Sequence, residues 1–173
     1  IYDKELLKLQ AQHSGIAEKV LESYDESPTS SLLYSIVMDV YPSMNYVGTS
    51  LNQQVYQAQF DSISKLQEKG NCVTVGRGAD YILRDYDNVV NIFIMSDIDV
   101  RTNNVCERLN CDRNKARKII NDKENSRASY YNYYTGKEWG NSKSYHICVD
   151  SSVLGIEGTA ELLAEFIRKR FDI

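Results

Sequence analysis

This sequence has few histidines and cysteines, no net positive charge and no long apolar run. Only two histidines and four cysteines occur among the 173 residues. No two cysteines are spaced as Cys-x-x-Cys, which argues against a zinc site. The net charge is −4. This charge argues against a general nucleic-acid-binding protein, because affinity for phosphates needs a basic surface.

Membrane and export signals are also missing from the sequence. No run approaches the ~18 apolar residues that identify a membrane span, and no signal peptide is visible. A cytoplasmic protein without membrane association is therefore expected. The cysteines are best interpreted as free thiols of such a protein, because Cys72 and Cys148 lie inside apolar, strand-like runs.

What is present is typical of a globular domain. Hydrophobic residues make up 42% of the chain and charged residues 25%, and the length suffices for one domain over residues 1–173 with its own core. Continuous apolar runs at 72–76 and 89–95 are typical of parallel strands covered on both faces. A last strand is expected at 145–150. Strands that alternate with helices predict an α/β fold with a mostly parallel sheet.

Three helical regions separate or follow these strands. The clearest is 50–69, which Gly70 ends. A long charged helical region is expected over about 97–134, and a final helix follows the last strand. The residues expected on the buried face of the first helix are Leu51, Val55, Ala58, Ser62 and Leu66, and those of the last helix are Leu162, Leu163, Phe166 and Ile167.

The run "NCVTVGRGAD" places Arg77 between two glycines at the end of an expected strand. Ligands bind at the carboxyl ends of strands in such sheets, and the planar fork of an arginine matches phosphate oxygens. The flanking glycines allow a sharp turn and leave room for a ligand. The equally supported alternative is a structural ion pair of Arg77 with Asp80 or Asp85.

A second informative stretch is rich in cations and then in tyrosines, over about residues 113–140. Helical spacing places Lys123 and Arg127 on one face and brings Glu124 within reach of Arg127. A basic helix is usually a solvated surface, and the tyrosines are more often packing residues than a stacking platform. A mobile basic lid over phosphates is the alternative function of this stretch.

Several pieces of the sequence, in a fixed order along nearly the whole chain, are similar to those of one known family. They are "YDKELL" at 2–7, "NCVTVGRGADYIL" at 71–83, "NIFIMSDIDVR" at 91–101, "ENSRASYYNYYTGKEWG" at 124–140 and "YHICVDSSVLGIE" at 145–157. Each piece is weak alone, but the set is specific. On this set the chain resembles the cytidylate kinase-like family, within the P-loop nucleoside monophosphate kinases.

The resemblance implies a three-layer P-loop kinase-like domain with a mostly parallel sheet and a helical lid at about 113–140. It implies transfer of a phosphoryl group from ATP, with Mg²⁺, to a nucleoside monophosphate such as cytidylate. No protein ligand for the metal is identifiable. The implied substrate-binding residues are Arg77, Asp80 and Asp3, the catalytic residues Arg127 and Lys123, the residue that orients the lid Glu124, and the ATP-binding residues Arg101, Ser151 and Ser152.

Two departures from the family pattern concern the first part of the chain. The family's glycine-rich phosphate-binding loop is expected just upstream of "YDKELL", and no run of the type G-x-x-x-x-G-K-S/T occurs in the sequence. The arginine and serine that cytidylate kinases place after the second strand are not evident, and Lys4 and Leu9 fall near those positions. Cytidine specificity is therefore not predicted by the sequence itself.

Three functions stay open at this point. The first is a nucleotide kinase, the second is a degenerate kinase or nucleotide-binding regulator, and the third is an unrelated α/β interaction domain. The family arrangement places a further strand between the strand at 72–76 and the strand at 89–95. Those two strands are therefore expected either to flank an additional strand or to pair directly.

Overall fold

The computed structural model describes residues 51–68 and 70–173, and these residues fall into two compact units. In the described part of the chain, the first unit consists of residues 51–68, 70–85 and Ser129–Thr135. The second unit consists of Tyr86–Ala128 and Gly136–Ile173. Asp3, Lys4 and Leu9 lie outside the described residues. The expectation of a single domain over 1–173 stays a prediction.

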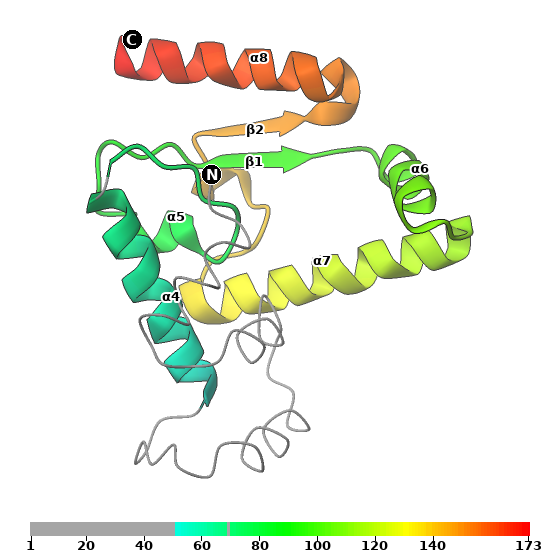
Figure 1. Cartoon of the computed structure of the whole chain (residues 1–173), viewed down its shortest axis with the longest axis horizontal. Coiled ribbons are helices and arrows are strands. Elements are labelled where there is room, and N and C mark those ends of the chain that lie inside the picture. The colour runs from blue at the N-terminus through cyan, green and yellow to red at the C-terminus, as the bar shows by residue number, and fades with distance from the viewer. Residues whose placement is uncertain (1–50, 69) are drawn as a thin grey trace. The chain divides into compact units, whose positions relative to one another are not determined.

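Helix α4, Leu51–Glu68, dominates the described part of the first unit (Figure 1). It confirms the helix predicted over 50–69. The predicted face is buried from Val55 onward, and α4 contacts the short helix α5, Ala79–Ile82. Gly70 follows with φ +123°, a backbone conformation that side chains with a Cβ rarely adopt. The helix therefore ends where the sequence predicts.

The run 72–76 does not form the strand that the sequence predicts. Only Thr74 has a bridge-type backbone pairing, and no strand of the described residues includes it. Val73 is 58% exposed and Val75 is 51% exposed. The prediction assumed a strand covered on both faces, and these exposed side chains show that the assumption is wrong.

The second unit contains a parallel pair of strands, β1 (Ile92–Met95) and β2 (Ile147–Asp150). Ile92 lies opposite Ile147, and Met95 lies opposite Asp150. The pairing is extended before the strands, because His146 donates its N–H to the Asn91 carbonyl at 2.8 Å and accepts the Asn91 N–H on Nδ1 at 2.9 Å. The strands predicted at 89–95 and 145–150 are thus confirmed, and each is shorter than predicted.

Helices flank this sheet in the chain. Helix α6, Ile98–Leu109, follows β1, and helix α7, Arg113–Thr135, follows α6. The predicted helical region 97–134 is confirmed, but it is interrupted at Asn110, where φ is +48°. Val105, Ala116 and Ile120 form the buried cluster between the two helices. The last seven residues of α7, Ser129–Thr135, belong to the first unit.

Helix α8, Ser151–Phe171, runs beside β2, with which it is in contact (Figure 1). A short 3-10 turn, η1 (Ser142–Ser144), precedes β2. The backbone of α8 is kinked at Gly155, where φ is +70° and ψ is −179°. Of the predicted apolar face, Leu163, Phe166 and Ile167 are half-buried and Leu162 is exposed. No helix of residues 51–68 or 70–173 is long and apolar enough to cross a membrane.

The alternation of helices with a small parallel sheet confirms the α/β class. β1 pairs with β2, whereas the run 72–76 belongs to the first unit. The expected spacing between 72–76 and the strand at 89–95 is therefore not tested and stays a prediction.

Candidate functional site

The turn around Arg77 has an unusual backbone. Gly76, Arg77 and Gly78 all have positive φ angles, of +71°, +57° and +65°. Glycine adopts this region freely, but a residue with a Cβ pays roughly 1–2 kcal/mol to enter it. Backbone strain of this kind persists only where the surroundings fix it, and it concentrates at functional sites. Arg77 therefore has a conformation that its own sequence preference does not explain.

The side chain of Arg77 is only 3% exposed. Its Nη1 donates a hydrogen bond to the carbonyl oxygen of Val75 at 3.2 Å. A buried guanidinium needs partners for its charge and its donors, because burying a charge alone is costly. The sequence favours an Arg77 side chain that is presented to a ligand, whereas the structure shows this side chain buried in the first unit.

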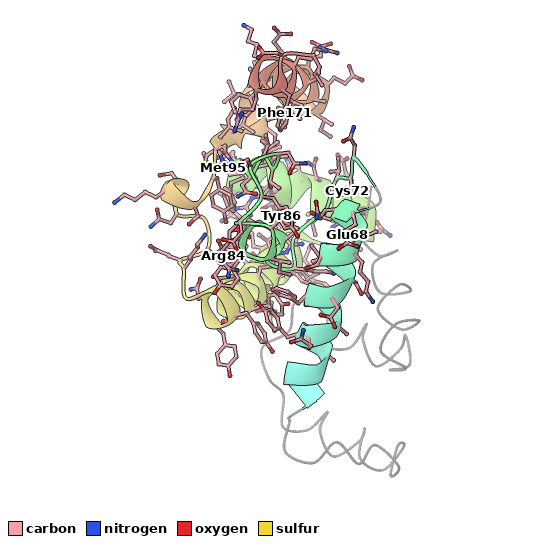
Figure 2. All side chains as sticks on the ribbon, turned by 90° about the vertical axis from the view of Figure 1, so that its left-hand side faces the viewer. Glu68, Cys72, Arg84, Tyr86, Met95 and Phe171 are labelled. Carbon is pink, nitrogen blue, oxygen red and sulfur yellow. The ribbon has the colours of Figure 1, made fainter. Side chains whose placement is uncertain are left out.

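The carboxylates considered as ion-pair partners of Arg77 have other partners in the structure. The hydroxyl of Tyr131, near the end of α7, donates to Asp80 Oδ2 at 2.6 Å. Asp85 Oδ2 lies 3.7 Å from Nη2 of Arg84. Arg84, labelled in Figure 2, also lies over the ring of Tyr81 at 4.2 Å from its centroid.

The end of α7 packs against the Arg77 turn within the first unit. A Cβ added at Gly78 would lie 3.7 Å from the Thr135 methyl group, and Thr135 and Tyr131 are both buried. The sequence pattern alone does not indicate Tyr131 as a partner of this turn. The one indication in the sequence is that Tyr131 and Thr135 are four residues apart, which places both side chains on the same face of a helix.

A second group of site residues surrounds the carboxyl ends of β1 and β2. Asp97 caps α6, and Asp150 caps α8. Ser151 Oγ donates to the Met95 carbonyl at 3.0 Å, and Ser152 Oγ accepts the Asp97 N–H at 3.4 Å. The hydroxyls of both predicted ATP-binding serines therefore form hydrogen bonds that link the end of β2 to the end of β1.

Ser152 also donates hydrogen bonds to the neighbouring carboxylate. Its hydroxyl donates to Asp150 Oδ1, and its N–H donates to the same oxygen at 2.9 Å. These two hydrogen bonds lower the pKa of Asp150, with the hydroxyl bond as the larger cause. The cap of α8 is thus an ionised carboxylate at neutral pH.

Arg101 lies on the first turn of α6, where its N–H donates to the Asp97 carbonyl at 3.0 Å. Its Nη1 forms an ion pair with Oε1 of Glu124 on α7, and both side chains are about one-third exposed. The Nε atom of Arg101 is buried and has no hydrogen-bond partner. A donor left in this state costs roughly 1–3 kcal/mol, so it is suited to an acceptor brought by a ligand.

Lys123 and Arg127 are exposed and lie one turn apart on α7, as the helical spacing predicts. Glu124 is half-buried between them in the sequence, and the structure joins it to Arg101. The role of Glu124 in orienting Arg127 stays a prediction. The structure thus brings together Arg101 and Glu124 in the second unit. In the first unit Asp80 lies on α5, directly after the turn that contains Arg77.

The described residues offer no ready-made cage for a metal. In residues 51–68 and 70–173 there is no group of three or more His, Cys, Asp or Glu side chains that could hold an ion. Magnesium in phosphoryl transfer is usually held by nucleotide phosphates, waters and one or two carboxylates, so such a cage is not what the expected chemistry requires.

The chain is similar to known proteins in both fold and sequence. The chain is similar to a crystal structure described as an uncharacterized protein from Eubacterium ventriosum ATCC 27560, with 28% identity, a TM-score of 0.65, and 92% of each chain covered. No curated protein matches the chain significantly. This likeness supports an α/β protein. The chain belongs to the cytidylate kinase-like family, which it matches over residues 1–153.

Proposed function

We propose that this protein is a nucleotide kinase that transfers a phosphoryl group from ATP to a nucleoside monophosphate, with a cytidylate-like acceptor. Family membership suggests a nucleotide kinase in general. The observation that carries the finer proposal is the Arg77 turn, where a buried arginine has a left-handed backbone between two glycines. Strain of this kind is typical of a binding site.

In this proposal Arg77 binds the phosphate of the acceptor. Its planar fork of donors gives two parallel charge-assisted hydrogen bonds to phosphate oxygens. Burial strengthens these bonds, because a guanidinium in a low-dielectric site is poorly screened. Asp80, held by Tyr131, is the proposed polar contact beside it. Asp3 is proposed as a further substrate contact.

The proposed catalytic residues are Arg127 and Lys123. An oxygen of the acceptor phosphate attacks the γ-phosphorus of ATP, and the bond from that phosphorus to the β,γ-bridging oxygen breaks. Negative charge spreads over the transferring group, so cations placed beside it lower the barrier. Lys123 and Arg127 are exposed and lie one helical turn apart. This placement suits two cations that approach phosphates when a lid at about 113–140 closes.

Arg101, Ser151 and Ser152 are the proposed residues beside the base of ATP. The buried, unpartnered Nε of Arg101 fits a ligand that supplies an acceptor. The two serines hold the strand ends that would border the nucleotide. ATP supplies the phosphoryl group, and Mg²⁺ bound to its phosphates neutralises part of their charge. We expect a cytoplasmic protein without a nucleic-acid or membrane partner.

The experiment measures calorimetric affinity for a panel of nucleoside monophosphates, and turnover with ATP and Mg²⁺. Arg77→Ala should weaken the best monophosphate by roughly 2–4 kcal/mol, since it removes charge-assisted contacts. Arg84→Ala is the matched control, because this nearby arginine is exposed. Unchanged affinity in Arg77→Ala, alongside a large loss of stability, would make Arg77 a structural residue only.

The alternative function is a degenerate, nucleotide-binding relative. It shares with the kinase the buried Arg77 that would bind a monophosphate, and it differs from the kinase only in the lack of turnover. Binding of a monophosphate without turnover would support this alternative. With turnover, Arg127→Ala should lower kcat more than acceptor affinity, because its contact is made mainly in the transition state.

A further inference from the structure

The end of helix α6 brings two cysteines close together. The helix ends at Leu109, and Asn110 follows in the left-handed region. The N–H groups of Asn110 and Cys111 both donate to the carbonyl oxygen of Cys106, the latter at 3.2 Å. This bond from Cys111 back to Cys106 is the one that closes a Schellman turn, in which the side chains of the same two positions commonly contact each other.

Packing supports the same juxtaposition. Cys106 and Cys111 are both half-buried and both pack against the cluster of Val105, Ala116 and Ile120. The backbone hydrogen bond and standard bond lengths hold their Cα atoms within roughly 7 Å of each other. That separation reaches into the range in which a disulfide forms without moving the backbone.

The other two cysteines are placed differently. Cys148 lies in β2 opposite Phe93, and Cys72 belongs to the first unit. Neither shares a turn or a packing cluster with a second cysteine in the described structure. Cys72 and Cys148 therefore provide matched controls within the same chain.

The surroundings distinguish the two neighbouring thiols. Burial raises the pKa of Cys106, and so does the adjacent Cys111. Cys111 directly precedes the first turn of α7, where Asp112 accepts the Lys115 N–H at 2.9 Å. The thiolate is the nucleophilic form of a cysteine, and of this pair Cys106 is the one whose pKa is raised. Cys106 is thus suited to remain protonated until the second step.

We propose that Cys106 and Cys111 form a redox modification site, which a hydroperoxide such as hydrogen peroxide converts into an intramolecular disulfide. The Cys111 thiolate attacks one peroxide oxygen, the O–O bond breaks, and hydroxide leaves as Cys111 becomes a sulfenic acid. Sulfur of Cys106 then attacks sulfur of Cys111. The S–S bond forms, the S–O bond breaks, and the departing hydroxide takes the Cys106 proton to give water.

Atoms and electrons balance in this reaction. Two thiols lose two electrons and two protons, and the peroxide is reduced to two molecules of water or, for an alkyl hydroperoxide, to an alcohol and water. The product covalently closes the turn between α6 and α7. This turn directly precedes the segment proposed as the lid, but the modification is independent of the proposed kinase activity.

The test treats the full chain with hydrogen peroxide, blocks remaining thiols, and analyses tryptic peptides without reduction. Trypsin cuts after Arg101, Arg108 and Arg113, so Cys106 and Cys111 fall in the separate peptides TNNVCER and LNCDR. Only a disulfide joins them. We expect the joined pair to become the main form of both peptides, and a reductant to separate it.

Variants make the assignment specific. A Cys72→Ser/Cys148→Ser double variant should form the joined peptides as fast as the wild type. Cys106→Ser should instead accumulate a sulfenic acid at Cys111, detectable with a dione probe. Blocked, unjoined peptides after oxidation of the wild type would overturn the proposal, and so would a disulfide that includes Cys72 or Cys148. The wild-type measurement decides the proposal even if a variant fails to fold.

Discussion

The two units hold their apolar residues in different ways. In the first unit α4 buries Ile63, which is 1% exposed, and Arg77 is buried at a strained turn. In the second unit the strand β1 leaves Ile94 56% exposed. The contrast is one between these elements, since Val73 of the first unit is exposed and Ala116 of the second is buried. A strained conformation needs surroundings that fix it, and the first unit supplies them. The second unit holds its proposed site residues by helix caps and a partly exposed ion pair, which rearrange at lower free-energy cost.

The difference suits the two proposed tasks. A phosphate-binding arginine is most effective when it is fixed before the ligand arrives, because no reorganisation is then needed. A lid must change its position, so exposed cations such as Lys123 and Arg127 are appropriate there. Matched substitutions in the two units test this contrast between a rigid first unit and an adaptable second unit.

The largest effect is expected from truncating the same side chain in each unit. Ile63→Ala should lower the free energy of unfolding by about 2–5 kcal/mol, because it leaves a cavity in a packed core. Ile94→Ala should lower it by less than about 1 kcal/mol, because most of that side chain is already in water. Denaturant unfolding followed by circular dichroism measures both.

Equal losses in the two variants would contradict the contrast. The single tryptophan, Trp139, adds a local measurement, since it lies in the second unit and its ring packs edge-on against Phe93 with centroids 5.4 Å apart. Its fluorescence should follow the second unit in both variants.

Much of the second unit is predictable from local sequence. The apolar runs ending at Met95 and Asp150 predict the strands, and the charged stretch between them predicts helices, because these patterns reflect short-range spacing. The break at Asn110 is not predicted. Asparagine tolerates the left-handed region, but nothing in the sequence requires it to stop a helix there.

The candidate site is less predictable, because its contacts join residues far apart in the chain. The sequence correctly indicates an unusual turn at Arg77, since two glycines flank a charged residue. It does not indicate that Arg77 is buried, that Tyr131 binds Asp80, or that Glu124 binds Arg101. Such partners depend on tertiary packing, and helical spacing only brought Glu124 close to Arg127.

The next prediction tests how firmly the Arg77 turn is fixed. Tyr131→Phe removes the hydroxyl that donates to Asp80 and should lower the free energy of unfolding by about 1.5–3 kcal/mol, the range for hydrogen bonds to charged groups. It should also weaken monophosphate binding if Asp80 contacts the substrate.

Tyr133→Phe is the matched control, because Tyr133 lies on the same helix with 77% of its surface exposed. It should change the free energy of unfolding by less than about 0.5 kcal/mol. If the two variants are equally stable, the Tyr131 hydroxyl does not fix the turn.

A smaller effect is expected for the ion pair of the second unit. A double-mutant cycle with Arg101→Gln and Glu124→Gln should give a coupling free energy of about 0.2–1 kcal/mol, because both side chains are partly solvated. The measured quantity is the difference in unfolding free energy across the four proteins. High salt should reduce the coupling. A coupling above about 3 kcal/mol would show that this part of the second unit is as rigid as a buried core.

The smallest effect concerns pH and the cap of α8. Hydrogen bonds from Ser152 lower the pKa of Asp150 in the folded protein, so the unfolded chain takes up this proton first as the pH falls. The stabilisation by Asp150 is therefore fully present above the ordinary aspartate pKa of about 4 and is lost as the pH falls through the lowered folded value. Asp150→Asn should weaken the loss of stability below about pH 4, measured by Trp139 fluorescence during denaturant unfolding. Ser152→Ala should weaken it as well, because it removes the larger hydrogen bond while leaving the carboxylate. If both variants keep the wild-type pH dependence of the unfolding free energy, the Asp150 cap does not contribute to the acid sensitivity of the second unit.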